Sequence, residues 1–271
     1  MNKYLLSLVI FFIPLIIFAQ SEQIKVKVVE NNTTVKVKIQ LDKRKIEENN
    51  YRAPKYYYTN LTARTNDAIV FNISMGPTIS NNGIFRFKFE NTMRAKVIQF
   101  YTTDNRGKQK TVSVPIVPAE KVNKNNTKFF KILKPVTYTI ENDYRESNAD
   151  VWKAKTADKA IERLYDSLHF IENKIQIFTP KLNQKYESTP VSIKSDIKLE
   201  SIAVMIDEHE SPIIAIYSLL PNDIIDFHLR IVLPTHPKVM NLIVVGKGLD
   251  GKLYRSTQKV ELSLSGDSCG S

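Results

Sequence analysis

Residues 24–28 read Ile-Lys-Val-Lys-Val, and residues 35–41 read Val-Lys-Val-Lys-Ile-Gln-Leu. A polar break at residues 30–32, Glu-Asn-Asn, separates the two runs. Apolar and polar side chains alternate with a period of two, and alternate side chains of a strand point to opposite faces. The stretch therefore predicts a β-hairpin that buries one face.

The rest of the N-terminal part repeats this pattern. Alternating runs recur at residues 69–73 and 85–89, and a further pair at 97–102 and 111–116 is joined by the turn at 104–107, Asp-Asn-Arg-Gly. Short strands at this spacing are typical of a β-sandwich of the immunoglobulin-like kind. We expect one such domain over residues 21–118.

The C-terminal part has the same character after a linker and a helix. Residues 119–146 are rich in Asn and Lys and are interpreted as the linker. Ser147 can cap a helix over 147–168, whose apolar residues are spaced by three and four. These apolar residues are Trp152, Ala157, Ala160, Ile161, Leu164 and Leu168.

Strand-like runs follow near 174–178, 191–195, 201–206, 213–219, 225–232, 239–245 and 260–264, with a turn signal at 249–252, Leu-Asp-Gly-Lys. The predicted fold is all-β. It has two immunoglobulin-like β-sandwich domains with one helix preceding the second, which spans 147–271 and ends in a cysteine-bearing arm. Both halves have hydrophobic strand faces, so we expect the sandwiches to pack together.

The first twenty residues have the features of a signal peptide. Lys3 precedes an apolar run over residues 5–18, and Ala19 supplies a small residue at the expected cleavage point. The run is short for a membrane-spanning helix, and no later stretch approaches the necessary length. The sequence predicts export through a cleaved signal peptide to the periplasm, and the alternative is an uncleaved N-terminal anchor.

The net charge of +11 is unevenly distributed along the chain. Residues 21–118 hold 17 Lys and Arg against 8 Asp and Glu, whereas residues 147–271 hold 15 against 16. A basic domain can bind nucleic acid, but these lysines alternate with buried positions, which is typical of the solvent face of a strand. We therefore predict no nucleic-acid binding.

Cys269 is the only cysteine, so no internal disulfide can form, and no cysteine follows the signal peptide to carry a lipid anchor. Its neighbours Gly266, Asp267, Ser268 and Gly270 are small residues beyond the last predicted strand. The two glycines keep the backbone permissive. The five residues from 264 to 269 span about 17 Å when extended. The tail can therefore act as an arm that enters a deep pocket.

The thiol of this arm has no obvious means of activating itself. An exposed cysteine has a pKa near ~8.5, so roughly a few per cent is thiolate at neutral pH. No base is close in sequence, and the negative charge of Asp267 favours the protonated thiol. The chemistry would need the active site of another protein.

Other candidate sites are weaker. Residues 207–210, Asp-Glu-His-Glu, suit a solvated loop better than a metal site, because His169, His228 and His236 show no coherent spacing. Residues 56–58, three tyrosines, suit packing better than ligand stacking. No glycans are predicted at the Asn-x-Ser/Thr triplets, and no metal or cofactor is expected.

The ending of the chain resembles the SoxY subunit of the thiosulfate-oxidation carrier, which ends in a Gly-Gly-Cys-Gly-Gly arm. Residues 180–191 look like that family's entry to its second strand, and residues 250–254, Asp-Gly-Lys-Leu-Tyr, look like its Asp-Gly-Lys-x-Tyr. Asp267 and Ser268 stand where the family has glycine. They make the arm stiffer and place a negative charge near the thiol.

The N-terminal half resembles the partner subunit, SoxZ. Residues 80–87, Ser-Asn-Asn-Gly-Ile-Phe-Arg-Phe, look like that family's Asn-Pro-aromatic-x-Phe strand entry, with Gly83 in place of the proline. The turn at 103–107 is similar to its Asp-Asn-x-Gly turn. The order along the chain is SoxZ and then SoxY, which indicates a single-chain fusion of the SoxYZ carrier.

The resemblance implies a non-catalytic carrier. Cys269 would receive thiosulfate with the help of a SoxXA-type c-haem protein, a SoxB-type hydrolase would release sulfate, and a SoxCD-type sulfane dehydrogenase could follow. Two alternatives remain open: an exported immunoglobulin-like adhesion or structural protein with an inert tail, and a protein that dimerises through a disulfide at Cys269.

Overall fold

The computed structural model describes residues 24–41, 57–66, 68–79, 83–119, 144–183, 186–207, 209–220 and 223–263. The predicted signal peptide, nearly all of the predicted linker and the arm at 264–271 lie outside the described residues. Within the described ranges, no helix has the length and hydrophobicity needed to cross a membrane.

The N-terminal half contains only strands among its described residues. They are β1 (Lys25–Asn31), β2 (Thr34–Gln40), β3 (Tyr58–Thr65), β4 (Ala68–Met75), β5 (Ile84–Glu90), β6 (Val97–Asp104), β7 (Gln109–Pro115) and the short β8 (Val117–Pro118). The predicted hairpin is confirmed, since β1 and β2 pair from Lys25↔Gln40 to Asn31↔Thr34.

The C-terminal half begins with helical turns and continues as strands. The helical elements are α1 (Tyr144–Ser147), the 3-10 turn η2 (Val151–Lys153) and α2 (Ala157–Tyr165), and a later 3-10 turn is η3 (Tyr186–Ser188). The strands are β9 (Phe170–Glu172), β10 (Gln176–Phe178), β11 (Leu182–Asn183), β12 (Thr189–Lys194), β13 (Leu199–Ile206), β14 (Ile213–Ser218), β15 (Ile224–Ile231), β16 (Val239–Gly248) and β17 (Leu253–Leu262).

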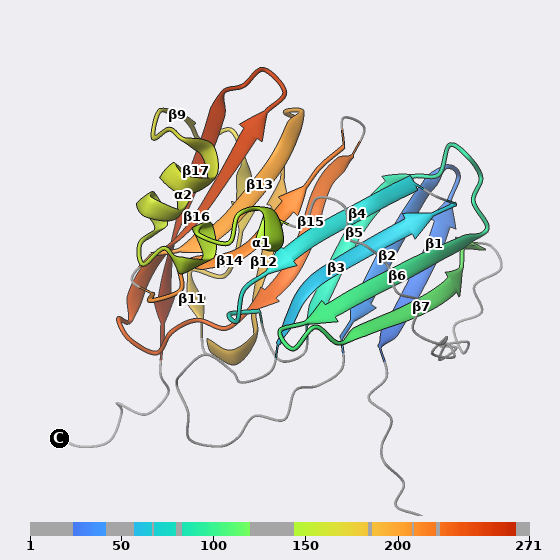
Figure 1. The fold of residues 1–271 in the computed structure, drawn as a ribbon, viewed down its shortest axis with the longest axis horizontal. Coiled ribbons are helices and arrows are strands. Elements are labelled where there is room, and N and C mark those ends of the chain that lie inside the picture. The colour runs from blue at the N-terminus through green and yellow to red at the C-terminus, as the bar shows by residue number, and fades with distance from the viewer. Residues whose placement is uncertain are drawn as a thin grey trace, which may run out of the picture.

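Two sheets run through both halves of the molecule (Figure 1). Sheet A has the order β10-β12-β15-β5-β2-β1-β8, and sheet B has the order β11-β17-β16-β13-β14-β4-β3-β6-β7, with β9 paired to β17. The halves meet where β5 pairs with β15 in sheet A and where β4 pairs with β14 in sheet B. The all-β prediction of two sandwiches that pack together is confirmed, and they share both sheets edge to edge.

One hydrophobic core lies between the sheets and includes residues of both halves. At the junction, Phe71 of β4 stacks on Phe87 of β5 with ring centroids 4.0 Å apart, and Tyr217 of β14 stacks on Phe227 of β15 at 4.6 Å. Phe71 also meets both C-terminal rings edge to face at 5.9 Å. Offset and edge-to-face pairs of this kind add to the burial energy.

The helix predicted over 147–168 is shorter than expected. It begins at Ala157, after Thr156 rather than Ser147, because the Thr156 hydroxyl accepts a hydrogen bond from the Lys159 amide at 3.3 Å. It ends where Asp166 adopts a left-handed conformation, φ 52°. Its Ala160 and Ile161 pack against β13, β14 and β16, so α2 covers the outer face of sheet B in this half (Figure 1).

Candidate functional site

The candidate arm follows β17, and a closed turn leads into that strand. Asp250 accepts hydrogen bonds from the Lys252 amide at 3.1 Å and the Tyr254 hydroxyl at 2.9 Å, and Gly251 has φ 77°. The amide of Lys252 and then the Tyr254 hydroxyl hold the pKa of the Asp250 carboxyl below its usual value. The motif Asp-Gly-Lys-x-Tyr therefore fixes the register of the β16–β17 hairpin.

The far end of β17 is held by backbone segments on both of its sides. The amide of Leu262 donates to the carbonyl of Lys238 at 2.8 Å, and the amide of Ser263 donates to the carbonyl of Asn183 at 3.0 Å. Asn183 is 5% exposed, and its side-chain amide donates to the Pro180 carbonyl at 2.8 Å. The chain is therefore fixed as far as residue 263.

Cys269 and its predicted neighbours Gly266, Asp267, Ser268 and Gly270 lie outside the described residues. The described residues give the geometry of the attachment point. From Ser263 to Cys269, six residues span about 20 Å when extended.

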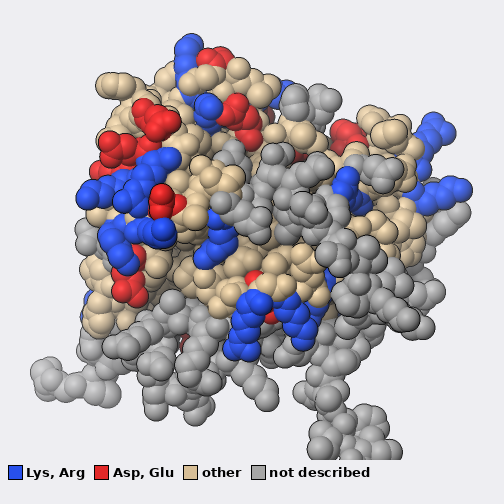
Figure 2. Space-filling model, viewed as in Figure 1, with Lys and Arg blue, Asp and Glu red and all other residues tan. Residues whose placement is uncertain are grey.

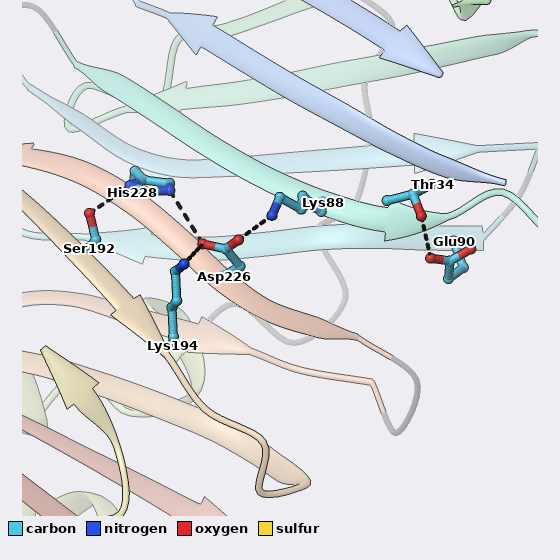
Figure 3. Close-up of polar contacts among 7 residues, drawn as sticks. All are labelled: Thr34, Lys88, Glu90, Ser192, Lys194, Asp226 and His228. Carbon is cyan, nitrogen blue, oxygen red and sulfur yellow. Dashed lines mark hydrogen bonds and ion pairs between the residues drawn. The ribbon is translucent and has the colours of Figure 1, made fainter. Parts of the chain in front are cut away.

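A cluster of charged side chains crosses the junction of the halves in sheet A (Figure 3). The Lys88 ammonium of β5 contacts Asp226 of β15, with Lys194 at 3.9 Å and the His228 ring at 3.3 Å from the other carboxylate oxygen. The Ser192 hydroxyl lies 2.6 Å from Nδ1 of His228. No motif at the sequence level identified this cluster, because its members are brought together only by the strand pairing.

Both titratable groups of this cluster are shifted. Burial acts to raise the pKa of the Asp226 carboxyl, but Lys88, with Lys194 and His228, outweighs it and holds the pKa below its usual value. Burial lowers the pKa of His228; Asp226 opposes that shift, while Arg86, Lys194 and Lys88 add to it. The cluster therefore holds an ionised carboxylate beside a neutral imidazole at neutral pH.

Arg145 of α1 is a second contact between the halves that the sequence reading missed. Its guanidinium donates to the Met75 carbonyl at 2.6 Å and to the Tyr57 hydroxyl at 2.7 Å, and it lies over the rings of Tyr57 and Trp152. A planar cation that stacks and donates in a fork suits this position better than lysine. Arg145 and Trp152 are seven residues apart in the sequence, so no local pattern marked this contact.

The weaker sequence candidates are engaged in local structure. The Asp207 carboxylate accepts from the amide and the side chain of Asn241, and His209 accepts from the Ser211 amide at 3.0 Å. Tyr58 is buried in the core at 1% exposure. Glu208 lies outside the described residues, and among those described no three His, Cys, Asp or Glu side chains gather as metal ligands would.

Two family models match the chain, one in each half. The model of the sulphur oxidation protein SoxZ matches residues 19–115, and that of the sulfur oxidation protein SoxY matches residues 161–267. The chain joins a SoxZ-like half to a SoxY-like half. The second match ends two residues before Cys269. The families place the chain among the carriers of sulfur oxidation, which are generally non-catalytic.

Similarity to individual proteins is weaker than the match to the two family models. No curated protein matches. The structure of the sulfur carrier protein SoxY from Chlorobium limicola f thiosulfatophilum is 29% identical over 40% of this chain and 97% of that chain, with a TM-score of 0.37. A superoxide reductase (neelaredoxin) from Ignicoccus hospitalis is 12% identical over 34% of this chain and 81% of that chain, with a TM-score of 0.30. The family assignment therefore comes from the two family models.

Proposed function

We propose that this chain is an exported sulfur carrier that binds thiosulfate-derived intermediates covalently on the thiol of Cys269. The observation that carries the proposal is the joining of both carrier halves in one chain, with the only cysteine seven residues beyond the end of β17. Export rests on the signal-peptide pattern of residues 1–20, which also makes the periplasm the proposed compartment.

The proposed loading step is an oxidative coupling. The thiol and thiosulfate form a cysteine S-thiosulfonate with loss of one proton and two electrons, and the electrons pass to the haems of a SoxXA-type partner. Water at a SoxB-type hydrolase then cleaves the terminal S–S bond, which releases sulfate and two protons and leaves a persulfide on Cys269. A SoxCD-type partner could oxidise that sulfane sulfur further.

The chain supplies the thiol, the arm and the surface that docks, and the partners supply the catalysis. The fixed attachment at Leu262 and Ser263 supports this division. A short arm on a rigid base delivers its thiol to a defined depth in each partner, whereas a frayed last strand would spread the thiol over many positions.

Replacement of the thiol tests the proposal. Cys269→Ala and the isosteric Cys269→Ser should both abolish thiosulfate-dependent reduction of cytochrome in a reconstituted system, because neither can hold the intermediate. The free energy of unfolding should change by no more than about 0.5 kcal/mol, because the residue lies beyond the last strand.

Ser268→Trp is the matched control for arm entry. It keeps the thiol titratable but adds bulk beside it, so coupled turnover should fall while labelling by a small thiol reagent continues. Mass spectrometry of the wild type after turnover should show a thiosulfonate or sulfane adduct on Cys269. Normal turnover by Cys269→Ser would disprove the carrier proposal, and a mass that halves on reduction would favour the disulfide-linked dimer.

A further inference from the structure

The outer face of sheet A carries a group of basic side chains, five in the N-terminal half and one, Lys194, in the C-terminal half. Its outward side chains come from β2, β5, β1 and β12, and cross-strand pairing aligns them: Lys27 pairs with Lys38, which pairs with Arg86, while Lys36 pairs with Lys88. We call this surface the basic face. It consists of Lys27, Lys36, Lys38, Arg86, Lys88 and Lys194.

The charges of the basic face are only partly neutralised. Asp226 contacts Lys88 and lies near Lys194, and Glu90 lies on the same face of β5, where it accepts a hydrogen bond from Thr34 at 2.7 Å. Within the described part of the chain, no carboxylate lies within ion-pair distance of the other four, Lys27, Lys36, Lys38 and Arg86, which are all exposed. Neighbouring strands lie about 4.8 Å apart, so the row from Lys27 to Arg86 places the backbone positions of three basic residues within about 10 Å.

This arrangement costs the fold stability. Like charges that lie directly opposite one another on paired strands are destabilising. Polar residues without charge would cover the same face without that cost. An acidic surface that lies against the face relieves this repulsion. The charges therefore favour binding to such a surface, although they do not stabilise the fold.

The opposite side of the molecule differs. Seen from the side of α2, acidic and basic side chains lie close together over the C-terminal half (Figure 2). Ion pairs there include Lys247 with Glu200 at 2.7 Å and Arg255 with Glu172 at 2.5 Å. Mixed charge of this kind is an ordinary solvated surface, unlike the aligned cations of the basic face.

We propose that the basic face docks the acidic surface of a protein that processes the arm. The inference rests on the proposed function and names the chemistry of the partner surface. A carrier must meet and leave several partners, and electrostatic complementarity raises the association rate without requiring tight binding. Because Lys194 of the SoxY-like half belongs to the same face, the docked partner would contact both halves at once.

Binding of a purified SoxXA-type haem protein to the immobilised full chain tests this surface, since binding does not need the thiol chemistry. The variant K27Q/K36Q/K38Q/R86Q removes four charges from the basic face. The control K96Q/K108Q/K159Q/K174Q removes four exposed lysines that lie outside the strands of sheet A. Both variants lower the net charge equally.

At low salt the basic-face variant should associate at least about tenfold more slowly than the wild type, and the difference should vanish at high salt. The control should resemble the wild type. Equal rates for the two variants, or no binding by the wild type, would overturn the proposal. A membrane role would also overturn it. In that case phosphatidylglycerol vesicles would bind the wild type and not the basic-face variant, while both proteins would bind the haem protein equally fast.

Failure of the carrier proposal has a different signature. If no protein with an intact Cys269 gains a thiosulfate-derived adduct, the carrier chemistry is wrong whatever the binding rates show. If the adduct forms in every protein and the two variants bind alike, only the docking surface is wrong.

Discussion

The two junctions between the halves are built differently. In sheet B, β4 and β14 form a regular ladder from Met75↔Ala215 to Asn72↔Ser218. In sheet A, the pairing of β5 and β15 is interrupted, since Ile224 pairs with Lys88 and His228 pairs with Arg86. Between these pairs, three residues of β15 thus oppose one of β5. The first junction is an unbroken ladder, and at the second the charged cluster around Asp226 adds to an irregular one.

Close approach distinguishes the sheet B junction further. The amide of Gly76 donates to the Ile214 carbonyl at 2.8 Å, and a Cβ at this glycine would lie 2.3 Å from the Ile213 carbonyl oxygen. Only glycine fits without a shift of the backbone. The comparison teaches that the two halves can be joined in two ways. The sheet B junction requires close backbone packing, whereas the sheet A junction tolerates irregular pairing because ion pairs between side chains also connect the strands.

The largest effect is expected from the aromatic core between the two junctions. Phe71→Ala should lower the free energy of unfolding by about 3–5 kcal/mol, because Phe71 is 4% exposed and contacts rings of both halves. Denaturation should be followed by circular dichroism and by the fluorescence of Trp152, the only tryptophan.

Trp152 lies in the SoxY-like half and stacks on Arg145, so its fluorescence reports on that half and on the Arg145 contact with the other half. If the shared core couples the halves, both signals should shift together in Phe71→Ala. Phe100→Ala, a buried residue of β6 away from the junction, serves as the control of equal size. A Trp152 midpoint that stays in place while the circular dichroism midpoint falls would show that the halves unfold independently.

Much of the fold could be predicted from local patterns, but the junctions could not. Period-two alternation identified β1, β2, β4, β5 and most C-terminal strands. It missed β3, because both faces of that strand are buried and its sequence mixes Asn60 and Thr62 with apolar residues. These polar side chains form a hydrogen bond with each other, in which the Thr62 hydroxyl donates to Asn60 Oδ1 at 2.9 Å.

The contacts across the halves depend on residues far apart in the chain. Lys88 and Asp226 are separated by 138 positions, and neither has a neighbour in sequence that marks it. The candidate site has the opposite character. Cys269 was recognisable because the sequence has a single cysteine beyond a strand, whereas the hydrogen bonds that fix Ser263 follow from the pairing of β11 and β17.

The sheet A junction should respond to pH. Asp226→Asn keeps the shape of the side chain and removes its charge, so we expect a loss of about 1–2 kcal/mol at pH 7. The pKa of Asp226 is lower in the folded than in the unfolded chain. Its carboxylate therefore stabilises the fold fully above about pH 4, the pKa of the unfolded chain, and this stabilisation is lost as pH falls through the folded pKa. The two stability curves should therefore converge in acid.

Two other groups titrate in the same experiment. His228 has a lowered folded pKa, so the wild type also loses stability as pH falls below about 6.5. Burial raises the pKa of Asp223 to about 6, which opposes this trend equally in both proteins. Glu172→Gln, which breaks an exposed pair with Arg255, is the control and should cost no more than about 0.5 kcal/mol. A constant difference between wild type and Asp226→Asn at all pH values would contradict the assignment.

The smallest effect, with the opposite sign, is expected at the sheet B junction. Tyr217 is 1% exposed, and in the described part of the structure its hydroxyl has no hydrogen-bond partner. A buried unsatisfied polar group costs about 1–3 kcal/mol, so Tyr217→Phe should leave stability unchanged or raise it by up to about 1 kcal/mol. The ring stays in place, and with it the stack on Phe227.

Alkaline titration sharpens this prediction, because burial raises the pKa of Tyr217 well above its usual value. The unfolded chain ionises this tyrosine near pH 10 while the folded chain keeps it neutral, so the wild type loses stability as pH rises beyond that point. Tyr217→Phe lacks the group in both states and should lose less. Chemical denaturation at pH 7 and at about pH 10.5 measures the two differences. If the stability advantage of Tyr217→Phe over the wild type is larger at about pH 10.5 than at pH 7, the hydroxyl is buried without a partner in the junction. If the variant is less stable than the wild type at both pH values, the hydroxyl forms a hydrogen bond there.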